Sequence, residues 1–448
     1  MALSSEKDTQ FSKKEIKESL EQILSEIQCS GSFLTSGSFK SGINPGLEVP
    51  SAGPIGLPLS VEAAKKIIQA SHISPYGKGN ETLVDESVRK SWELNTDQFS
   101  LKNPAWTEQI DTLLQAAVSG LGLMARPAEI KAELYKLLVY EEGAFFLPHR
   151  DSEKADGMFG TLVVSLPSRH EGGDVVAMHK GDSLTFSSSQ GSDFGFSYAA
   201  WYSDVTHEVK AVTSGYRLVL TYNLIHRPSA TSLENLDNTS AKLTSLLETW
   251  ATLCQEVYPP EDEPVEWLPN DDDDNDNDCP RALLYTLNHK YTSAELSFSR
   301  LKGVDQEQVS EARKACQKTG FSLFLVNIEK TDIGDVEDCY GRCDHGSHHR
   351  ISSLIESSLV FSLIVEPKGD TPFAKGVSID TSIFMQEDPF PDYPDDEDFE
   401  GFTGNEGATT AHFYRLTTAD YRGHRANINL GKNSDSARQY MPQNTQGL

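Results

Sequence analysis

The sequence predicts a mainly β protein with flanking helices, an α+β arrangement in which one all-β core is followed by a further α+β region. Two observations predict it. Between residues 133 and 224, eight short runs rich in β-branched and aromatic residues are separated by turn residues, which is typical of a sandwich or jelly roll. The chain has 448 residues, more than one such core needs, so two or three structural units are expected.

The N-terminal part, residues 1–125, is expected to form helices and loops that pack on the core. Residues 13–28 place apolar side chains on one side at helical spacing, which predicts an amphipathic helix that covers a sheet. Residues 30–60 are rich in Gly, Ser and Pro and predict loops with short strands. Residues 61–71 and 108–121 predict two more helices.

The β core is expected over residues 126–228. Its turns are marked by Gly143, Pro167 and the pair Gly172-Gly173. The predicted strands are residues 133–141, 144–149, 159–166, 174–178, 183–188, 198–203, 207–212 and 216–224.

The C-terminal region, residues 240–448, is expected to mix helices and strands. The patterns predict helices over 241–257 and 306–320, strand-turn-strand over 281–301, and strands over 321–328 and 359–365. No His-x-Asp motif of the kind present at residues 149–151 occurs in this half.

The formal net charge of −28 argues against a nucleic-acid partner, because the basic residues are scattered and a phosphate backbone would be repelled. Much of the charge lies in two acidic runs, residues 261–278 and 387–400. We expect solvated, mobile loops there. A docking surface for a basic partner or for calcium is the alternative, although the first run lacks EF-hand spacing.

The cysteines and the N-terminus favour an intracellular location, cytoplasmic or nuclear. The six cysteines are scattered and form no small-domain disulfide framework. The first residues lack an apolar signal core, and no apolar run approaches the length of a membrane span, so no membrane partner is expected.

One set of residues indicates chemistry: His149-Arg150-Asp151, followed by His207 and Arg217. On a strand, residues two apart point to the same side, so His149 and Asp151 can reach one metal ion. His207 can supply a third ligand. Two imidazoles and one carboxylate hold one face of a ferrous ion and leave positions open for reactants.

Arg217 lies in an otherwise apolar predicted strand. A buried guanidinium without an anion costs several kcal/mol, so this arginine implies a carboxylate, most simply a bound one. If Thr213-Ser214-Gly215 is a hairpin turn, Ala211 faces Arg217, and His207 shares that face roughly 13 Å away along the ladder. A small diacid would then fit between metal and guanidinium.

Each residue alone has an ordinary explanation: a chance His-x-Asp, a core histidine, or half of a structural ion pair. The ordered set is more specific than its parts.

His149-Arg-Asp151 with Asp193-Phe-Gly195 also imitates protein-kinase motifs, but a kinase needs Asn five residues after the catalytic Asp, where this chain has Asp156.

His149-x-Asp151, His207 and Arg217 resemble the signature of iron(II)- and 2-oxoglutarate-dependent oxygenases, in particular the prolyl 4-hydroxylase-like branch. The likeness covers about residues 126–226. Weaker likeness, at residues 75–79 and 403–407, is to uncharacterised long members of that group.

The resemblance implies a double-stranded β-helix, or jelly roll, with iron(II) bound by those three ligands. It implies that Arg217 binds the far carboxylate of 2-oxoglutarate, that Tyr140 touches this co-substrate, and that Thr161 supplies a second hydroxyl. The implied reaction is a dioxygenase hydroxylation that releases succinate and carbon dioxide, with ascorbate as a candidate reductant. A protein side chain is the slightly favoured substrate and a small molecule the other; the alternative is an inactive scaffold used for binding or sensing.

One further segment carries several possible metal ligands, and four of them could hold zinc. The spacing fits no common zinc motif, so a polar loop is the expected explanation. The residues are Cys339, Cys343, His345, His348 and His349.

Overall fold

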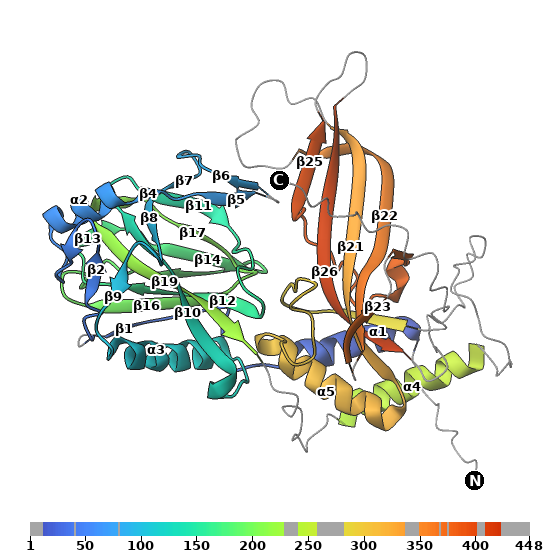
Figure 1. The fold of residues 1–448 in the computed structure, drawn as a ribbon. Helices are drawn as coiled ribbons and strands as arrows, with labels where there is room; N and C mark the ends of the chain where they lie inside the picture. The colour runs from blue at the N-terminus through green and yellow to red at the C-terminus, as the bar shows by residue number, and fades with distance from the viewer. Residues whose placement is uncertain are drawn as a thin grey trace, which may run out of the picture. The chain divides into compact units, whose positions relative to one another are not determined.

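The computed structural model in Figure 1 forms two compact units, each containing its own antiparallel sheets. The first unit comprises residues 22–239 and 286–312, and the second comprises residues 1–21, 240–285 and 313–448. Residues 22–125 thus share a unit with the predicted core. The structure describes residues 12–39, 42–78, 81–227, 241–257, 282–336, 349–366, 369–373, 376–400 and 408–422.

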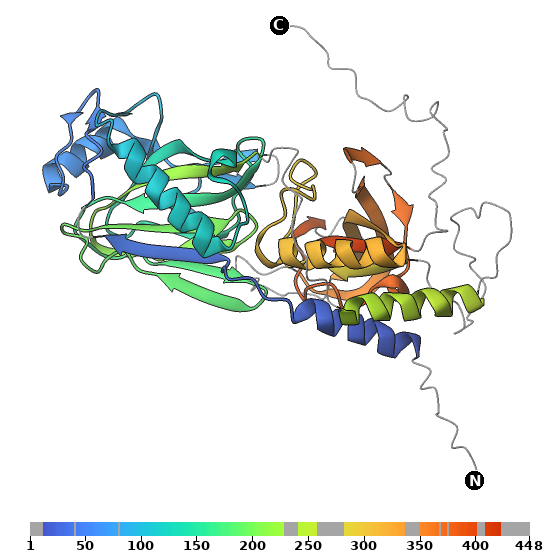
Figure 2. The ribbon, with the colours of Figure 1, turned by 90° about the horizontal axis from the view of Figure 1, so that it is seen from below.

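A seven-stranded antiparallel sheet forms one layer of the first unit. Its central strands are buried along their whole length, because one face packs on the core and helix α3 (Trp106–Leu121) covers part of the other (Figures 1 and 2). Its order is β1 (Leu34–Phe39), β16 (Phe196–Tyr202), β12 (Met158–Ser165), β19 (Arg217–His226), β10 (Ile130–Tyr140), β8 (Trp92–Asn95) and β4 (His72–Ile73).

A five-stranded antiparallel sheet forms the other layer. Both sheets contribute to a single apolar cluster, in which Val164 of one sheet and Ala177 of the other are fully buried. The order is β15 (Asp182–Phe186), β14 (Val175–His179), β17 (Thr206–Val209), β11 (Phe145–His149) and β7 (Arg89–Lys90).

Short elements complete this unit. Helix α2 is capped by the Ser60 hydroxyl, which accepts a hydrogen bond from the Ala63 amide at 3.1 Å. The short elements are α2 (Val61–Ala70), η1 (Pro127–Glu129), the pairs β13 (His170–Gly172) with β18 (Val212–Gly215) and β5 (Tyr76–Lys78) with β6 (Glu81–Leu83), and the set β2 (Leu47–Val49), β3 (Gly53–Pro54) and β9 (Ser100–Leu101).

Each of the eight runs predicted as core strands contains a strand, but the predicted hairpin between His207 and Arg217 is wrong. Strand β17 pairs with β11 and β14, whereas β19 pairs with β10 and β12. The presumed turn is itself the short strand β18, paired with β13. The chain therefore changes sheets between Val209 and Arg217, as strands do at the corner of a two-layer β structure.

The second unit is built around an antiparallel sheet that the sequence predicted only in part. Strands β21 and β22 are far longer than predicted, and the sequence analysis placed no strand where β26 lies. The sheet runs β20 (Ala282–Thr286), β26 (Thr409–Arg422), β21 (Ser322–Val336), β22 (Ile351–Glu366) and β23 (Gly369–Phe373); β24 (Val377–Ser378) pairs with β22, and β25 (Asp396–Glu400) with β26.

The predicted helices of this half are present, and α1 is amphipathic as expected, with Ile16, Leu20 and Leu24 fully buried. The unit includes all or part of α1 (Lys13–Ser25), α4 (Ala241–Val257) and α5 (Gly303–Thr319), together with the short helix η2 (Thr381–Ile383). Among the described residues, none of the helices has both the length and the apolar composition that crossing a bilayer requires.

Some expectations for the C-terminal half need correction, and others fall on residues that the structure does not describe. Only Ala282–Thr286 of the predicted strand-turn-strand is a strand, and residues 287–302 contain neither strand nor helix. Within the second acidic run, residues 396–400 form a strand instead of a loop, because they pair with β26. The first acidic run and four members of the Cys/His cluster lie outside the described residues; the fifth, His349, lies 2.9 Å through Nδ1 from Glu397 Oε1.

Candidate metal centre

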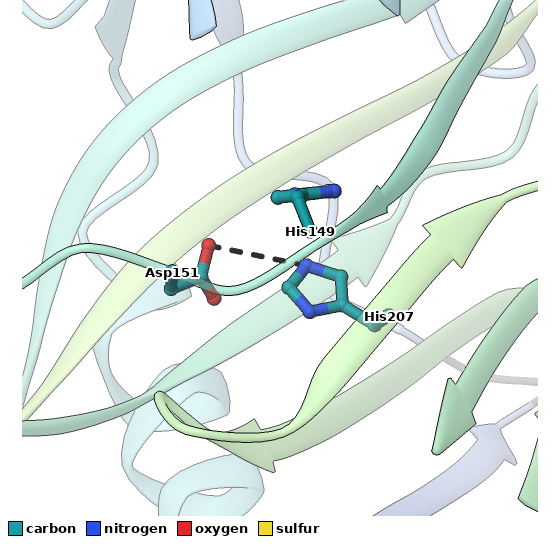
Figure 3. A group of neighbouring side chains, drawn as sticks. All are labelled: His149, Asp151 and His207. Atoms are coloured by element: carbon teal, nitrogen blue, oxygen red, sulfur yellow. Dashed lines mark ion pairs between the residues drawn. The ribbon is translucent and has the colours of Figure 1, made fainter. Parts of the chain in front are cut away.

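Strand pairing brings the two histidines of the predicted site together. His149 ends β11 and His207 lies on β17, and the two residues face each other across the antiparallel pair. Directly opposed residues project to the same face, so the ring centroids lie 4.2 Å apart. Asp151 lies two residues beyond the end of β11, so the premise that it shares a strand with His149 is wrong. The loop nevertheless returns it to the same point (Figure 3).

The backbone orients both imidazoles. His149 Nδ1 lies 2.8 Å from the Leu147 carbonyl oxygen, and His207 Nδ1 lies 3.1 Å from that of Val205. Because a carbonyl only accepts, each Nδ1 carries the hydrogen, and in the neutral form of each ring the lone pair is on Nε2. This is how proteins fix the tautomer of metal-binding histidines.

Asp151 presents one carboxylate oxygen to the histidines. Its Oδ2 accepts hydrogen bonds from Thr161 Oγ1 at 2.7 Å and from Trp201 Nε1 at 3.0 Å. Its Oδ1 lies 3.9 Å from His207 Nε2 (Figure 3) and accepts no hydrogen bond from the described residues. The candidate ligand atoms of the three residues all lie within 4.8 Å of one another.

The protonation states suit a divalent cation. Burial lowers the pKa of His149 to about 3, and the neighbouring His207 adds to this effect. Burial would raise the pKa of Asp151, but His207, His149 and its two hydrogen bonds outweigh it and hold that pKa below its ordinary value. At neutral pH the site therefore offers a neutral His149 imidazole and a carboxylate, the forms in which these side chains bind metal.

Arg217 lies at the start of β19 and is 1% exposed. Its Nε donates to Ser188 Oγ at 3.0 Å, and its Cζ lies 5.3 Å from the ring centre of Tyr140, its partner in the β10–β19 pair. Its Nη2 is buried without a hydrogen-bond partner. Within the described part of the chain, no carboxylate oxygen lies within 4.0 Å of the guanidinium. A buried cation with a free donor fits a bound carboxylate.

The Ser188 hydroxyl connects Arg217 to a buried histidine. His170 Nδ1 lies 2.7 Å from the Ser168 carbonyl oxygen, and its Nε2 lies 3.0 Å from Ser188 Oγ. Since the carbonyl accepts from Nδ1, Ser188 donates to Nε2 and accepts from Arg217. Burial lowers the pKa of His170, with Arg217 contributing in the same direction, which keeps this arrangement neutral.

Gly173 leaves room for the arginine. A Cβ at this position would lie 3.0 Å from Arg217 Cδ and 3.0 Å from Val212 Cγ2, and its φ of +73° is one that other residues rarely adopt. The sequence predicted only a turn here. The structure adds that the turn passes directly against the arginine side chain.

The structure brings together His149, Asp151 and His207 and places Tyr140 against Arg217. The Thr161 hydroxyl donates to Asp151, and its contact with a co-substrate stays a prediction. Trp201, Ser188 and His170 were not among the predicted site residues. Their roles depend on which strands are neighbours, and no motif or spacing in the sequence indicates this.

Two imidazoles and one carboxylate with open positions fit iron(II). The unpartnered Arg217 Nη2 fits the remote carboxylate of a keto diacid. On the chemistry of their donor atoms, the residues present therefore suit both groups that the sequence predicted.

Comparison with known proteins finds similarity to solved structures. No family model matches the chain, and no curated protein matches it. Among the solved structures that match are prolyl hydroxylases, a member of the 2-oxoglutarate–Fe(II) oxygenase family and a non-heme α-ketoglutarate-dependent epimerase.

A Pseudomonas putida prolyl-4-hydroxylase is 17% identical with a TM-score of 0.30, and the match covers 47% of this chain and 100% of that one. A 2-oxoglutarate–Fe(II) oxygenase family oxidoreductase from Burkholderia pseudomallei is 16% identical with a TM-score of 0.26, covering 48% and 92%. A Trichoplax adhaerens prolyl hydroxylase in complex with a hypoxia inducible factor peptide fragment is 14% identical with a TM-score of 0.30, covering 50% and 94%. Likeness at this level assigns neither an activity nor a substrate.

A second His–Asp–His group lies in the same unit, formed by His179, Asp204 and His289. Asp204 Oδ2 lies 3.0 Å from His289 Nδ1 and 3.6 Å from His179 Nε2. Lys302, whose side chain is 1% exposed, places its Nζ 3.2 Å from Asp204 Oδ1. This group was not predicted, because His289 and Lys302 come from the C-terminal half of the sequence.

Proposed function

We propose that the chain is an Fe(II)- and 2-oxoglutarate-dependent dioxygenase that hydroxylates a protein side chain or a small molecule. In that reaction the substrate, 2-oxoglutarate and dioxygen become the hydroxylated product, succinate and carbon dioxide. The observation that carries the proposal is the buried guanidinium of Arg217, whose Nη2 has no hydrogen-bond partner, in the same two-layer unit as an oriented His–Asp–His group. We assign the two antiparallel layers to a double-stranded β-helix.

Each residue has a distinct task in this proposal. His149, Asp151 and His207 would hold the iron, while Thr161 and Trp201 keep Asp151 turned toward it. Iron(II), when bound, supplies the dioxygen chemistry that decarboxylates 2-oxoglutarate and hydroxylates a C–H bond.

Arg217 would bind the far carboxylate of 2-oxoglutarate with its free donors, beside the ring of Tyr140. The Ser188 hydroxyl holds the guanidinium in position through Nε. Because the guanidinium is buried, little water competes for its donors. A charge-assisted hydrogen bond from Arg217 to the co-substrate carboxylate is therefore stronger than it would be in solvent.

The same proposal includes four further points: the substrate class, the absence of nucleic-acid and membrane partners, an intracellular location, and ascorbate as the reductant. The net charge of −28 supports the exclusion of nucleic acid. An inactive scaffold is the competing function. The retained ligand set and arginine favour the enzyme, because nothing in a purely structural role requires a buried guanidinium to keep a free donor.

The test is succinate release from 2-oxoglutarate with added iron(II) and ascorbate, measured for the wild type, for Asp151→Ala and for Asp111→Ala, an exposed acidic control on α3. We expect substrate-independent turnover in the wild type and the control and none in Asp151→Ala. Absence of both turnover and iron uptake in the wild type would favour the scaffold.

A further inference from the structure

Residues 287–302, here called the strap, belong to the first unit although the chain on both sides of them continues into the second. The strap contains no helix or strand, yet much of it is buried. Buried irregular backbone needs side-chain partners for its polar groups. Those partners identify what the strap touches.

Both ends of the strap hold the turn that precedes His207. Asp204 lies three residues before this ligand and receives three groups from the strap: His289 Nδ1 at 3.0 Å, the Lys290 amide at 3.1 Å and Lys302 Nζ at 3.2 Å. The same turn follows β16, which carries Trp201, a hydrogen-bond donor to Asp151. Any displacement of Asp204 would therefore reach two parts of the iron site.

Another part of the strap holds the loop that follows Asp151. Thr292 Oγ1 donates to Glu153 Oε2 at 3.0 Å, two residues beyond the ligand. Arg300 Nη1 lies 3.4 Å from Asp156 Oδ1. The strap thus contacts both irregular segments that carry or adjoin the metal ligands.

The strap is itself braced. The Asp305 carboxylate, at the start of α5, accepts from the amides of Asn288 and His289 at 2.6 and 2.9 Å and from the Tyr291 hydroxyl at 3.0 Å. Lys302 Nζ also lies 3.6 Å from Glu295 Oε1. A braced element can hold other segments in place, whereas a loose one would only cover them.

A metal ion is a poor occupant for the second His–Asp–His group. Both oxygens of Asp204 already have partners, and Lys302 supplies the positive charge that a metal would bring. The group is better suited to joining two segments than to binding a cation.

We propose that the strap is a positioning element for the iron site, holding the turn before His207 through Asp204 and the loop after Asp151 through Thr292 and Arg300. The expected effect on iron binding rests on the proposed function. The claim that the strap holds these two segments in place does not, because it concerns only contacts within the protein. Lys302 and His289 are positioning residues, because they act on the ligands through Asp204.

The experiment compares four variants with the wild type, with Thr292→Ser as the conservative exchange. Thr292→Val removes one hydroxyl, and Asp204→Asn with Lys302→Met removes both members of that ion pair, so that Asp204 is not left as an unpaired buried carboxylate. Lys131→Met is the control, since it breaks a largely exposed ion pair with Glu133 elsewhere in the same unit. Amide hydrogen exchange at residues 151–157 and 203–207 is measured without metal, and iron(II) or cobalt(II) affinity is measured by anaerobic titration.

We expect faster exchange at both segments in the double variant, faster exchange at 151–157 in Thr292→Val, and a metal affinity about 10- to 100-fold lower in the double variant, the range for residues that support metal ligands. Thr292→Ser should restore the wild-type exchange, and Lys131→Met should change neither readout. Unchanged exchange, or faster exchange with unchanged metal affinity, would overturn the proposal. If the wild type binds no metal, the proposed function fails, and the exchange data still decide whether the strap holds these segments.

Discussion

The first unit contains two groups that each consist of two histidines and one aspartate. The groups differ in the partners of the aspartate carboxylate. In the first, Asp151 Oδ1 accepts no hydrogen bond from the described residues and faces His207 at 3.9 Å. In the second, both oxygens of Asp204 are engaged and Lys302 lies 3.2 Å away. Ligand-type residues at suitable distances are therefore insufficient evidence of a metal site. A neighbouring fixed cation turns the same set into a structural ion-pair cluster.

The largest expected effect tests whether Lys302 decides this difference. Lys302→Met leaves Asp204 as a buried carboxylate without its cation, which costs about 3–5 kcal/mol of unfolding free energy. Added zinc should restore part of the loss, because the open carboxylate and two histidines then form a metal site. Urea unfolding of the metal-free protein, with and without zinc, measures both effects. A variant as stable as the wild type would show that Lys302 is not what neutralises Asp204.

A matched pair of histidine variants separates the two groups by metal affinity. His207→Ala removes a proposed ligand and should weaken iron(II) or cobalt(II) binding by roughly 100-fold or more, beyond the 10- to 100-fold range of supporting residues. His289→Ala acts only through Asp204 and should weaken it by about 10-fold or less. Equal losses in the two variants would mean that the groups do not differ in the way described.

The smallest expected effect is on acid stability of the metal-free protein. Burial lowers the pKa of His149 in the folded state to about 3, so between that value and the ordinary value of 6.5 the unfolded chain binds more protons. Stability from this group is present above pH 6.5 and is lost as the pH falls toward 3. Between pH 6.5 and 5.5 the loss is about 1 kcal/mol.

Chemical unfolding at the two pH values, for the wild type and for His149→Gln, isolates this contribution. The variant should lose less stability on acidification. Asp151, whose pKa is also lowered, acts in the same direction but at lower pH, so it does not obscure the result. A variant with the same pH response as the wild type would remove His149 as the cause.

The sequence predicted the elements of the first unit better than their arrangement. Local alternation and turn residues were enough to locate a strand in each of the eight predicted runs, but not β7, β8, β13 or β18. They could not distinguish a hairpin turn from a corner, so residues 213–215 were taken as a turn when they belong to a strand paired with β13. Similarly, residues 287–302 look like a turn and a strand, but their polar groups bond to Asp204 and Asp305 instead of to a neighbouring strand.

The site shows the same limit. His149, Asp151, His207 and Arg217 could be named because their residue types stand out against apolar runs. The opposed register of His149 and His207 could not, since it depends on a pairing between strands about sixty residues apart. Ser188 and Trp201 carry no signal of their own, and only the fold gives them Arg217 and Asp151 as partners.

The most direct test of the central claim, that an iron centre and an arginine anchor together form one co-substrate site, is an anaerobic calorimetric titration. Wild-type protein and Arg217→Met are titrated first with cobalt(II) or iron(II) and then with 2-oxoglutarate. We predict one metal per chain for both proteins, one 2-oxoglutarate per metal-loaded wild-type chain, and at least about 100-fold weaker 2-oxoglutarate binding to the variant, the cost of about two charge-assisted hydrogen bonds. Equal 2-oxoglutarate affinity in the two proteins would contradict the account.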